Sequence, residues 1–387
     1  MIKVGVITGT RADYGLLYWL LIRLKEDSDI NLDIIVTGSH LSKSHGETYK
    51  IIENDGFEIT ETIPILLETD QSIDIAYSTS EAIKGFSNFF EKNKLDLIII
   101  LGDRYEALAA AISSLFARIP IMHLHGGEIT TGAYDDMIRH SITKMSTYHA
   151  TSNEEHSRRV IQLGEDPKNI RNYGAPGLES LKKSKVHTKD RLSELLHFNL
   201  ENFFLFTYHP ETLADISTEN QINNILKALD EFQDHNILFT YPNADDGGLA
   251  IINAITNYQN NNKDRCLAVP SLGQEKYFSA LFCCDLVVGN SSSGIIEAPS
   301  AGVPTVNIGE RQLNRVCAKS VIHSKNNFDD IIKSITFGLS DQFRNEKSHY
   351  TNPYGDGDTS AKIVNWIKKL DLKKKKTFHD LVAFEKK

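Results

Sequence analysis

The chain has 387 residues, 41% of them hydrophobic and 24% charged, which is enough to build two α/β domains with full cores. A formal net charge of −9 argues against a nucleic-acid partner, and no apolar run approaches the length that spans a bilayer. The start of the chain lacks the regions of a signal peptide, and its four cysteines show no metal-ligand spacing. We therefore expect a cytoplasmic protein with no nucleic-acid or membrane partner.

Apolar runs and helical segments alternate along the chain, a pattern typical of parallel sheets with helices on both faces. In the first half, near-continuous apolar runs predict buried strands at residues 2–8, 32–36, 95–101, 120–124 and 148–151. A Gly-Ala-Pro-Gly turn at residues 174–177 and a lysine-rich stretch after it predict a domain junction. We expect a first Rossmann-like domain over residues 1–174.

The second half repeats this scheme and predicts a doubly wound, Rossmann-like domain over residues 190–358. Its predicted strands lie at residues 203–208, 237–241, 267–269, 285–289 and 305–308. In the terminal segment, residues 359–387, apolar side chains at helical spacing predict a helix near residues 360–370 that packs back on the first domain. The lysine run at residues 373–376 is typical of a solvated tail.

Ligands of open α/β sheets bind beyond the carboxyl ends of the strands, so the loops at those ends carry the candidate chemistry. The first such loop lacks dinucleotide-binding spacing but places Arg11 and Ala12 at the start of a helix. The loop after residue 289 is rich in serine and opens another helix, where free N–H groups and the helix dipole attract anions. It predicts a diphosphate cradle at Ser291, Ser292 and Gly294, although a serine helix cap is the simpler alternative.

Other strand-end residues of the second half extend this anion site. Glu297, one turn beyond the serines, is placed to hold a pair of sugar hydroxyls. His209 and Asn243 follow two further strands and should face the same cleft. Arg311 follows the next strand, and with Arg11 it is predicted to clamp a diphosphate between the two domains, unless each is a solvated surface arginine.

Carboxylates concentrate in the strand-end loops of the first half. Asp103, Glu128 and Asp135 are expected to converge on one wall, where they would serve as general acids and bases. The alternatives are an ion pair of Asp103 with Arg104 and a capping role for Asp135. A metal site that includes His123 is a weaker hypothesis, because the ligand set is incomplete and His123 should lie on the opposite face of the sheet from the next residue.

An ordered set of motifs gives the chain a resemblance to a known family. The motifs are Gly-Thr-Arg-Ala-Asp-Tyr-Gly at 9–15, Gly-Asp-Arg at 102–104, His-Gly-Gly-Glu at 125–128, Asp-Asp at 135–136, Arg-His-Ser-Ile-Thr-Lys at 139–144, Asn243, Asn-Ser-Ser-Ser-Gly at 290–294, Glu297 and Arg-Gln at 311–312. Together they resemble the hydrolysing UDP-N-acetylglucosamine 2-epimerases, the bacterial sialic-acid pathway enzymes and the epimerase half of the bifunctional animal enzyme. The resemblance covers about residues 1–370.

The resemblance implies a GT-B-like arrangement of the two domains, with the active site in the interdomain cleft and UDP held mainly by the second domain. It implies anti elimination of UDP to give 2-acetamidoglucal, then addition of water to give N-acetylmannosamine. Because the chain has neither a dinucleotide fingerprint nor a ligand set for zinc, we expect no metal and no other cofactor. Arg11, His209, Ser291, Ser292 and Arg311 match UDP-binding positions. Asp103, Glu128 and Asp135 match or neighbour the acid and base positions. We also expect a homodimer or homotetramer.

One residue departs from the pattern of some relatives. They carry a catalytic glutamate where this chain has His125. Either His125 transfers the proton, as an imidazole suits near neutrality, or Glu128 does. The sequence leaves both open.

Three other functions share parts of these motifs. A GT-B glycosyltransferase would have the same UDP site but require an acceptor. A nucleotide-sugar sensor would show no turnover, and the many carboxylates argue against it. An epimerase of UDP-2,4-diacetamido-2,4,6-trideoxy-glucose, as in legionaminic-acid synthesis, has very similar motifs, and no residue excludes it.

Overall fold

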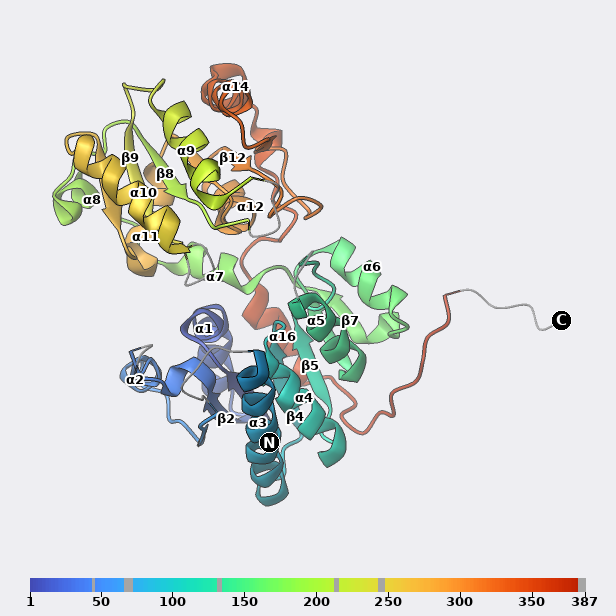
Figure 1. Ribbon diagram of the computed structural model, residues 1–387. Coiled ribbons are helices and arrows are strands. Elements are labelled where there is room, and N and C mark those ends of the chain that lie inside the picture. The colour runs from blue at the N-terminus through green and yellow to red at the C-terminus, as the bar shows by residue number, and fades with distance from the viewer. Residues whose placement is uncertain (44–45, 66–71, 131–133, 212–215, 243–247, 382–387) are drawn as a thin grey trace. The chain divides into compact units, whose positions relative to one another are not determined.

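The protein divides into two compact units, seen in a computed structural model that describes residues 1–43, 46–65, 72–130, 134–211, 216–242 and 248–381 (Figure 1). The first unit comprises Met1–Ser180 and Tyr354–Lys387, and the second comprises Leu181–Pro353. Helix α7 (Pro176–Lys183) carries the chain from the first unit into the second.

Within its described residues, the first unit contains a seven-stranded parallel sheet of order β3-β2-β1-β4-β5-β6-β7. Because the order reverses beside β1, loops that follow β1 and β4 diverge and leave the crevice where ligands of such sheets bind. The strands are β1 (Ile2–Thr8), β2 (Ile30–Thr37), β3 (Glu61–Ile63), β4 (Leu97–Leu101), β5 (Ile121–Leu124), β6 (Tyr148–Thr151) and β7 (Ile170–Asn172).

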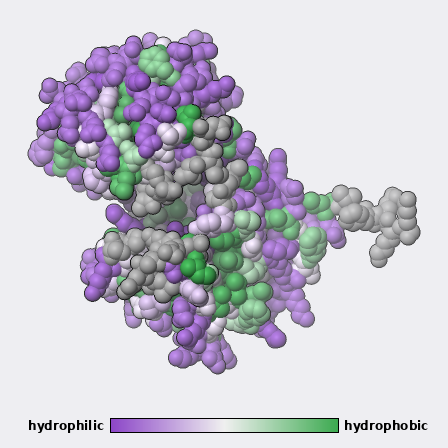
Figure 2. All heavy atoms as spheres, viewed as in Figure 1, coloured by the Kyte–Doolittle hydropathy of each residue, from purple (hydrophilic) through white to green (hydrophobic). Residues whose placement is uncertain are grey.

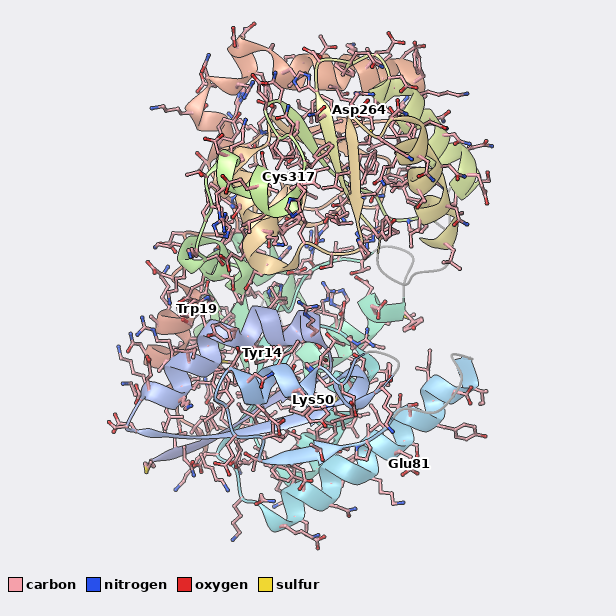
Figure 3. All side chains as sticks on the ribbon, turned by 90° about the vertical axis from the view of Figure 1, so that its left-hand side faces the viewer. Tyr14, Trp19, Lys50, Glu81, Asp264 and Cys317 are labelled. Atoms are coloured by element: carbon pink, nitrogen blue, oxygen red, sulfur yellow. The ribbon has the colours of Figure 1, made fainter. Side chains whose placement is uncertain are left out.

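Helices cover both faces of this sheet (Figure 1). One face packs against α1 (Arg11–Glu26), α2 (Tyr49–Asn54) and α16 (Thr359–Ile367), and the other against α3 (Ser72–Lys92), α4 (Tyr105–Ala117) and α5 (Tyr134–Met145). Tyr14, labelled on α1 in Figure 3, donates to Asp55 Oδ2 at 2.6 Å and ties α1 to the end of α2. The remaining short elements are η1 (Gly38–Leu41), α6 (Glu154–Gln162) and η2 (Pro167–Asn169).

The second unit is built on a six-stranded parallel sheet of order β10-β9-β8-β11-β12-β13, again counted over described residues. Its strands are β8 (Phe203–Thr207), β9 (Asn236–Thr240), β10 (Cys266–Val269), β11 (Leu286–Gly289), β12 (Thr305–Ile308) and β13 (Val321–Ser324). One face packs its aromatic core against α9 (Thr218–Leu229), α10 (Gly248–Asn261) and α14 (Phe328–Leu339). The other helices are α8 (Lys189–Leu196), α11 (Gly273–Cys283), α12 (Ser293–Ile296), α13 (Ala298–Ala301), α15 (Asp341–Arg344) and η3 (Lys347–Tyr350).

The predicted fold class of two doubly wound, Rossmann-like sheets is confirmed. Every strand predicted from an apolar run forms, whereas β3, β7 and β13 were not predicted, because each is an edge strand of three or four residues. The terminal helix forms as α16, and its apolar stripe joins the core of the first unit.

The lysine run near the C-terminus corrects a prediction. Lys374 Nζ lies 3.1 Å from both Asp166 Oδ2 and Asn169 Oδ1, and Lys376 Nζ contacts Glu165 and the carbonyl of Ser146. These two lysines therefore anchor the tail to the first unit and are not part of a solvated tail. Among the residues that the structure describes, no helix has both the length and the apolar character that crossing a membrane requires.

Candidate active site

Two sharp turns shape the candidate site of the first unit, at the carboxyl ends of β4 and β5. Gly102, after β4, has a φ of +79°, and His125, after β5, has a φ of +63°. A left-handed backbone is uncommon for a residue with a side chain. Gly127 continues the second turn at φ +81°, and a Cβ there would lie 2.3 Å from the carbonyl oxygen of His156. The His-Gly-Gly-Glu sequence thus allows a turn that few other sequences can adopt.

Within that turn, His125 and Glu128 form a close pair. His125 Nδ1 lies 2.5 Å from Glu128 Oε1, and the Ser152 hydroxyl donates to the same oxygen at 3.0 Å. A carboxylate only accepts hydrogen bonds, so Nδ1 carries a proton, and in the neutral imidazole the lone pair is then on Nε2. Nε2 is buried and has no hydrogen-bond partner among the described residues. The imidazole is therefore held in one tautomer, with its basic nitrogen free.

Arg139 joins this pair to Asp103. Its Nη1 lies 3.4 Å from Glu128 Oε2, and its Nη2 donates to Asp103 Oδ2 and, at 3.2 Å, to the hydroxyl of Thr130. Glu128 and Arg139 are both buried, so the two carboxylates balance a guanidinium that would be costly to bury alone. Burial alone would lower the pKa of Arg139, but Asp103 and Glu128 outweigh it and raise the pKa.

Asp135 lies in the first turn of α5, half-buried and within the field of Asp103. Burial and then the charge of Asp103 raise the pKa of Asp135 above its ordinary value. The structure thus brings Asp103, His125, Glu128 and Asp135 into one neighbourhood. The alternative pairing of Asp103 with Arg104 is wrong, because Arg104 Nε donates to Glu106 Oε1 at 2.6 Å.

His123 lies on the opposite sheet face from Leu124, as predicted, and both its ring nitrogens have partners. Nε2 lies 2.8 Å from the carbonyl oxygen of Gly102 and Nδ1 lies 3.0 Å from the hydroxyl of Thr143. Burial lowers the pKa of His123 to about 3, so it is a neutral, structural residue. No cluster of three or more His, Cys, Asp or Glu side chains suited to a metal ion occurs in the described part of the chain.

Sequence reasoning missed two groups near this site. Arg139 belongs to one of the motifs but was not predicted as a site residue, although its helical spacing of four residues from Asp135 places both on one face of α5. The second group is Asp13 on α1 with Glu106 on α4, beside the point where the strand order reverses. Burial, followed by the charge of Glu106, raises the pKa of Asp13 to about 6.

Arg11 and Ala12 begin α1, directly after β1, and both are exposed. The Thr10 side chain caps this helix by accepting from the N–H of Asp13 at 3.1 Å. Arg11 has no ion-pair partner among the described side chains, so its guanidinium is available to a ligand. Because Arg11 and Arg311 belong to different units, the predicted clamp between them stays a prediction.

In the second unit, Asn290 connects the loops at the ends of three strands. Its side-chain amide accepts from the N–H of His209 at 2.7 Å and donates to the carbonyl oxygen of His209 at 2.9 Å, which ties the loops after β8 and β11. Its own carbonyl oxygen accepts from Arg311 Nη1 at 3.3 Å and from Gln312 Nε2 at 2.9 Å, which adds the loop after β12. Asn290 is only 1% exposed, so these bonds are shielded from water.

Glu211 holds the loop that carries Arg311. Glu211 Oε1 accepts from the N–H groups of Glu310 and Arg311 at 2.8 and 2.9 Å. Gly309 precedes them at φ +87°, and a Cβ there would lie 2.3 Å from Glu211 Oε1. The carboxylate thereby sets the backbone from which the Arg311 side chain extends.

The serine-rich turn differs from the expected helix start. Helix α12 is a single turn, and the N–H of Gly294 already donates to the carbonyl oxygen of Ser291 at 3.2 Å. Gly294 is instead needed for packing, since a Cβ there would lie 2.7 Å from Thr305 Cγ2. The N–H groups of Ser291 and Ser292 donate no hydrogen bond among the described residues, so they are the donors left for an anion.

The two remaining predicted residues are Glu297 and Asn243. Glu297 is half-buried and links α12 to α13, one turn beyond the serines. Asn243 lies outside the described residues.

Comparison with known proteins identifies the family. The family model described as UDP-N-acetylglucosamine 2-epimerase matches residues 22–368. The chain is 42% identical over 326 residues to the Campylobacter jejuni GDP/UDP-N,N′-diacetylbacillosamine 2-epimerase (hydrolyzing), covering 84% of this chain and 85% of that one. It is 38% identical over 382 residues to polysialic acid biosynthesis protein P7 of Escherichia coli, covering 98% of this chain and 97% of that one.

A solved structure shares the fold. The crystal structure of UDP-GlcNAc 2-epimerase from Neisseria meningitidis bound to UDP-GlcNAc matches with a TM-score of 0.81 at 17% identity, covering 95% of this chain and 100% of that one. The chain therefore belongs to the UDP-N-acetylglucosamine 2-epimerase family. It is an enzyme of the hydrolysing UDP-sugar 2-epimerase type.

Proposed function

We propose that this enzyme converts UDP-N-acetylglucosamine and water to N-acetylmannosamine and UDP, for the synthesis of a sialic acid. The observation that carries the chemistry is the network of His125, Glu128, Arg139 and Asp103. It supplies a free basic nitrogen, a carboxylate that orients it and a second carboxylate held by the same buried arginine. No step in this proposal uses a metal or a nicotinamide.

In the first stage, His125 Nε2 takes the C2 proton while the C1–O bond to UDP breaks and a C1–C2 double bond forms. The C2 proton is not next to a carbonyl, so its removal depends on the departure of the diphosphate. Glu128 stabilises the imidazolium that results, as the carboxylate does in other histidine–carboxylate pairs. The product of this stage is 2-acetamidoglucal.

In the second stage, water adds to C1 and a proton returns to C2 from the opposite face, which gives the 2-epimeric sugar. Asp103 and Asp135 are the proposed acid and base for this stage. Asp135 is suited to carry a proton, because burial and the charge of Asp103 disfavour its ionised form.

The second unit is the proposed UDP site. Arg311 and the N–H groups of Ser291 and Ser292 supply positive potential for the diphosphate, with Arg11 contributed by the first unit. His209, Glu297, Ala12 and Asn243 are proposed to line the nucleotide and sugar. This local charge is needed because the chain as a whole is acidic.

A second substrate is favoured by one specific observation. The Campylobacter jejuni relative, at 42% identity, is named as an epimerase of GDP- or UDP-N,N′-diacetylbacillosamine. The alternative proposal is therefore UDP-2,4-diacetamido-2,4,6-trideoxy-glucose, in legionaminic-acid synthesis. The two sugars differ at C4 and C6, away from the reacting C1 and C2, so the proton-transfer network suits both.

The test is a side-by-side incubation with the two UDP-sugars, without an acceptor. Release of UDP and of the free 2-epimeric sugar, followed by NMR, is the expected result, and the ratio of kcat/KM for the two substrates assigns the enzyme. Turnover only with an added acceptor alcohol would identify a glycosyltransferase instead. UDP binding without turnover of either sugar would identify a sensor.

We further propose a homodimer or homotetramer in the cytoplasm. Large apolar side chains are exposed on three neighbouring helices of the first unit: Tyr77 on α3, Phe116 on α4 and Met137 on α5. Figure 2 shows apolar residues gathered on the surface over α4 and α5. Contact between subunits would remove this surface from water.

A further inference from the structure

A groove of the first unit has a charge opposite to that of the chain. The groove has a volume of about 630 Å³ and follows β7, the edge strand of the sheet, and the neighbouring helix α16. Its basic lining residues are Lys168, Arg171, Lys362, Lys369 and Lys374, and its one acidic lining residue among those described is Asp371. In a chain of net charge −9, such a concentration of cations requires an explanation.

Three of these cations form no ion pair with a carboxylate of the described residues. Lys362 pairs with Asp356 at 2.9 Å and Lys374 pairs with Asp166 at 3.1 Å. No described carboxylate lies within ion-pair distance of Lys168, Arg171 or Lys369. Three cations outside ion pairs, with Asp371 as the acidic lining residue among those described, give the groove a net positive potential that favours a ligand with several negative charges.

The guanidinium of Arg171 is already held in place. Its Nη1 donates to the carbonyl oxygen of Ile170 at 2.7 Å, and its Cζ lies 5.5 Å from the ring centroid of Trp366. Trp366 is fixed in turn by edge-on contacts with Tyr148 and Tyr173. An arginine ordered before binding loses little side-chain entropy on contact with an anion, and its planar fork fits two phosphate oxygens.

The groove is separate from the candidate active site within the same unit. It is bordered by the segment before β7 and by α16, whereas Asp103 and His125 follow the carboxyl ends of β4 and β5. None of its lining residues takes part in the His125–Glu128–Arg139 network.

We propose that this groove binds a small ligand that carries at least two phosphate groups. Its volume lies in the usual range for small-molecule sites. The planar guanidinium of Arg171 can donate two hydrogen bonds to phosphate oxygens, and the exposed Lys168 and Lys369 add two positive charges. The phosphates can belong to inorganic pyrophosphate or to a nucleotide. The two arms of the experiment distinguish these sources.

Trp366 provides the readout. The chain has two tryptophans, so Trp19→Phe, on α1 (labelled in Figure 3), leaves Trp366 as the only indole. This variant is titrated with pyrophosphate and, separately, with ADP at physiological salt. A saturable change in Trp366 emission is expected. Equal affinities would assign the site to the diphosphate itself, and tighter ADP binding would assign it to a nucleotide.

Matched variants assign the response to the groove. Lys168→Ala and Lys369→Ala should each raise the Kd for the tighter ligand roughly fivefold to tenfold, while Arg158→Ala, an equal change of charge on α6, should leave it unchanged. Arg311→Ala should also leave it unchanged, because that residue belongs to the proposed UDP site. The proposal is overturned if neither ligand gives a saturable response, if the lysine variants match Arg158→Ala, or if Arg311→Ala abolishes the response. The proposed UDP-sugar reaction can fail without affecting any of these outcomes.

Discussion

Asn290 is the residue at which the proposed UDP site is easiest to test, because its side chain ties loops together without itself carrying charge. Asn290→Ala removes two buried hydrogen bonds, of 2.7 and 2.9 Å, that hold the N–H and the carbonyl oxygen of His209. A hydrogen bond contributes a net stabilisation on the order of 0.5–1.5 kcal/mol, so the loss of two should lower the free energy of unfolding by about 1–3 kcal/mol. The loop after β8 is then no longer fixed to the serine-rich turn that begins at Asn290.

UDP binding should weaken because its contacts are no longer held in place. Loss of one charged hydrogen bond to the diphosphate corresponds to roughly 1.5–3 kcal/mol, on the order of tenfold to a hundredfold in Kd. Asn290→Asp should behave differently, since it keeps an acceptor for the His209 N–H but adds a negative charge beside the phosphates. We expect Asp to lose less stability than Ala and to lose at least as much UDP affinity.

Calorimetric titration with UDP and with uridine, together with urea unfolding, separates these effects. A general loss of structure would weaken both ligands, whereas misplaced diphosphate contacts weaken UDP and spare uridine. Asn236→Ala is the matched control, because its amide donates to the carbonyl oxygen of Asn199 at 2.8 Å at the opposite end of the same sheet. That variant should lose stability and keep its UDP affinity. If both Asn290 variants bind UDP within twofold of the wild type, the reasoning is refuted.

Three further predictions follow from the first unit. His125→Ala should lower kcat roughly a hundredfold to ten-thousandfold with little change in UDP affinity, and Glu128→Gln should lower it less, while solvent deuterium still enters C2 of the product, as NMR can show. The pKa of Asp13 is about 6 in the folded protein and 3.8 ordinarily, so folding favours the neutral form of this side chain. Its contribution to stability is therefore complete below pH 3.8 and is lost as the pH rises through 6. Asp13→Asn should therefore remove a decline on the order of 3 kcal/mol between these pH values, measurable by urea unfolding. Phe116→Asp, on the exposed apolar surface, should shift the mass found by light scattering toward the monomer, and an unchanged mass would exclude α4 from the interface.

The fold was predictable wherever a strand is buried on both faces. Such strands are apolar along their whole length, and each one predicted on this basis is present. The edge strands β3, β7 and β13 carry too few apolar residues to stand out from a loop. The β7 groove was not predicted for a different reason, because its cations come from segments about 200 residues apart in the sequence.

The candidate site was predictable in its loops but not in its connections. Strand-end position is sufficient to select Asp103, Glu128 and the serine turn, because parallel strands present their carboxyl ends at one edge. The bridging role of Arg139 depends on how α5 lies against the sheet, and that of Asn290 on where a neighbouring loop passes. Neither arrangement is encoded in local sequence, so an asparagine that ties three loops cannot be distinguished from an asparagine in a turn.

The geometry at His125 is the basis for proposing an imidazole, and not a carboxylate, as the group that takes the proton. At φ +63° the residue adopts a conformation that costs roughly 1–2 kcal/mol for an L-amino acid, and the Glu128 hydrogen bond to Nδ1 helps to offset that cost. The same bond fixes the tautomer and leaves Nε2 as the only nitrogen able to accept a proton. Glu128 cannot easily take that role, because its oxygens already accept from His125, Ser152 and Arg139. The strained turn and the occupied carboxylate therefore both support the proposed division of labour, in which the histidine would move the proton and the glutamate would hold the histidine in position.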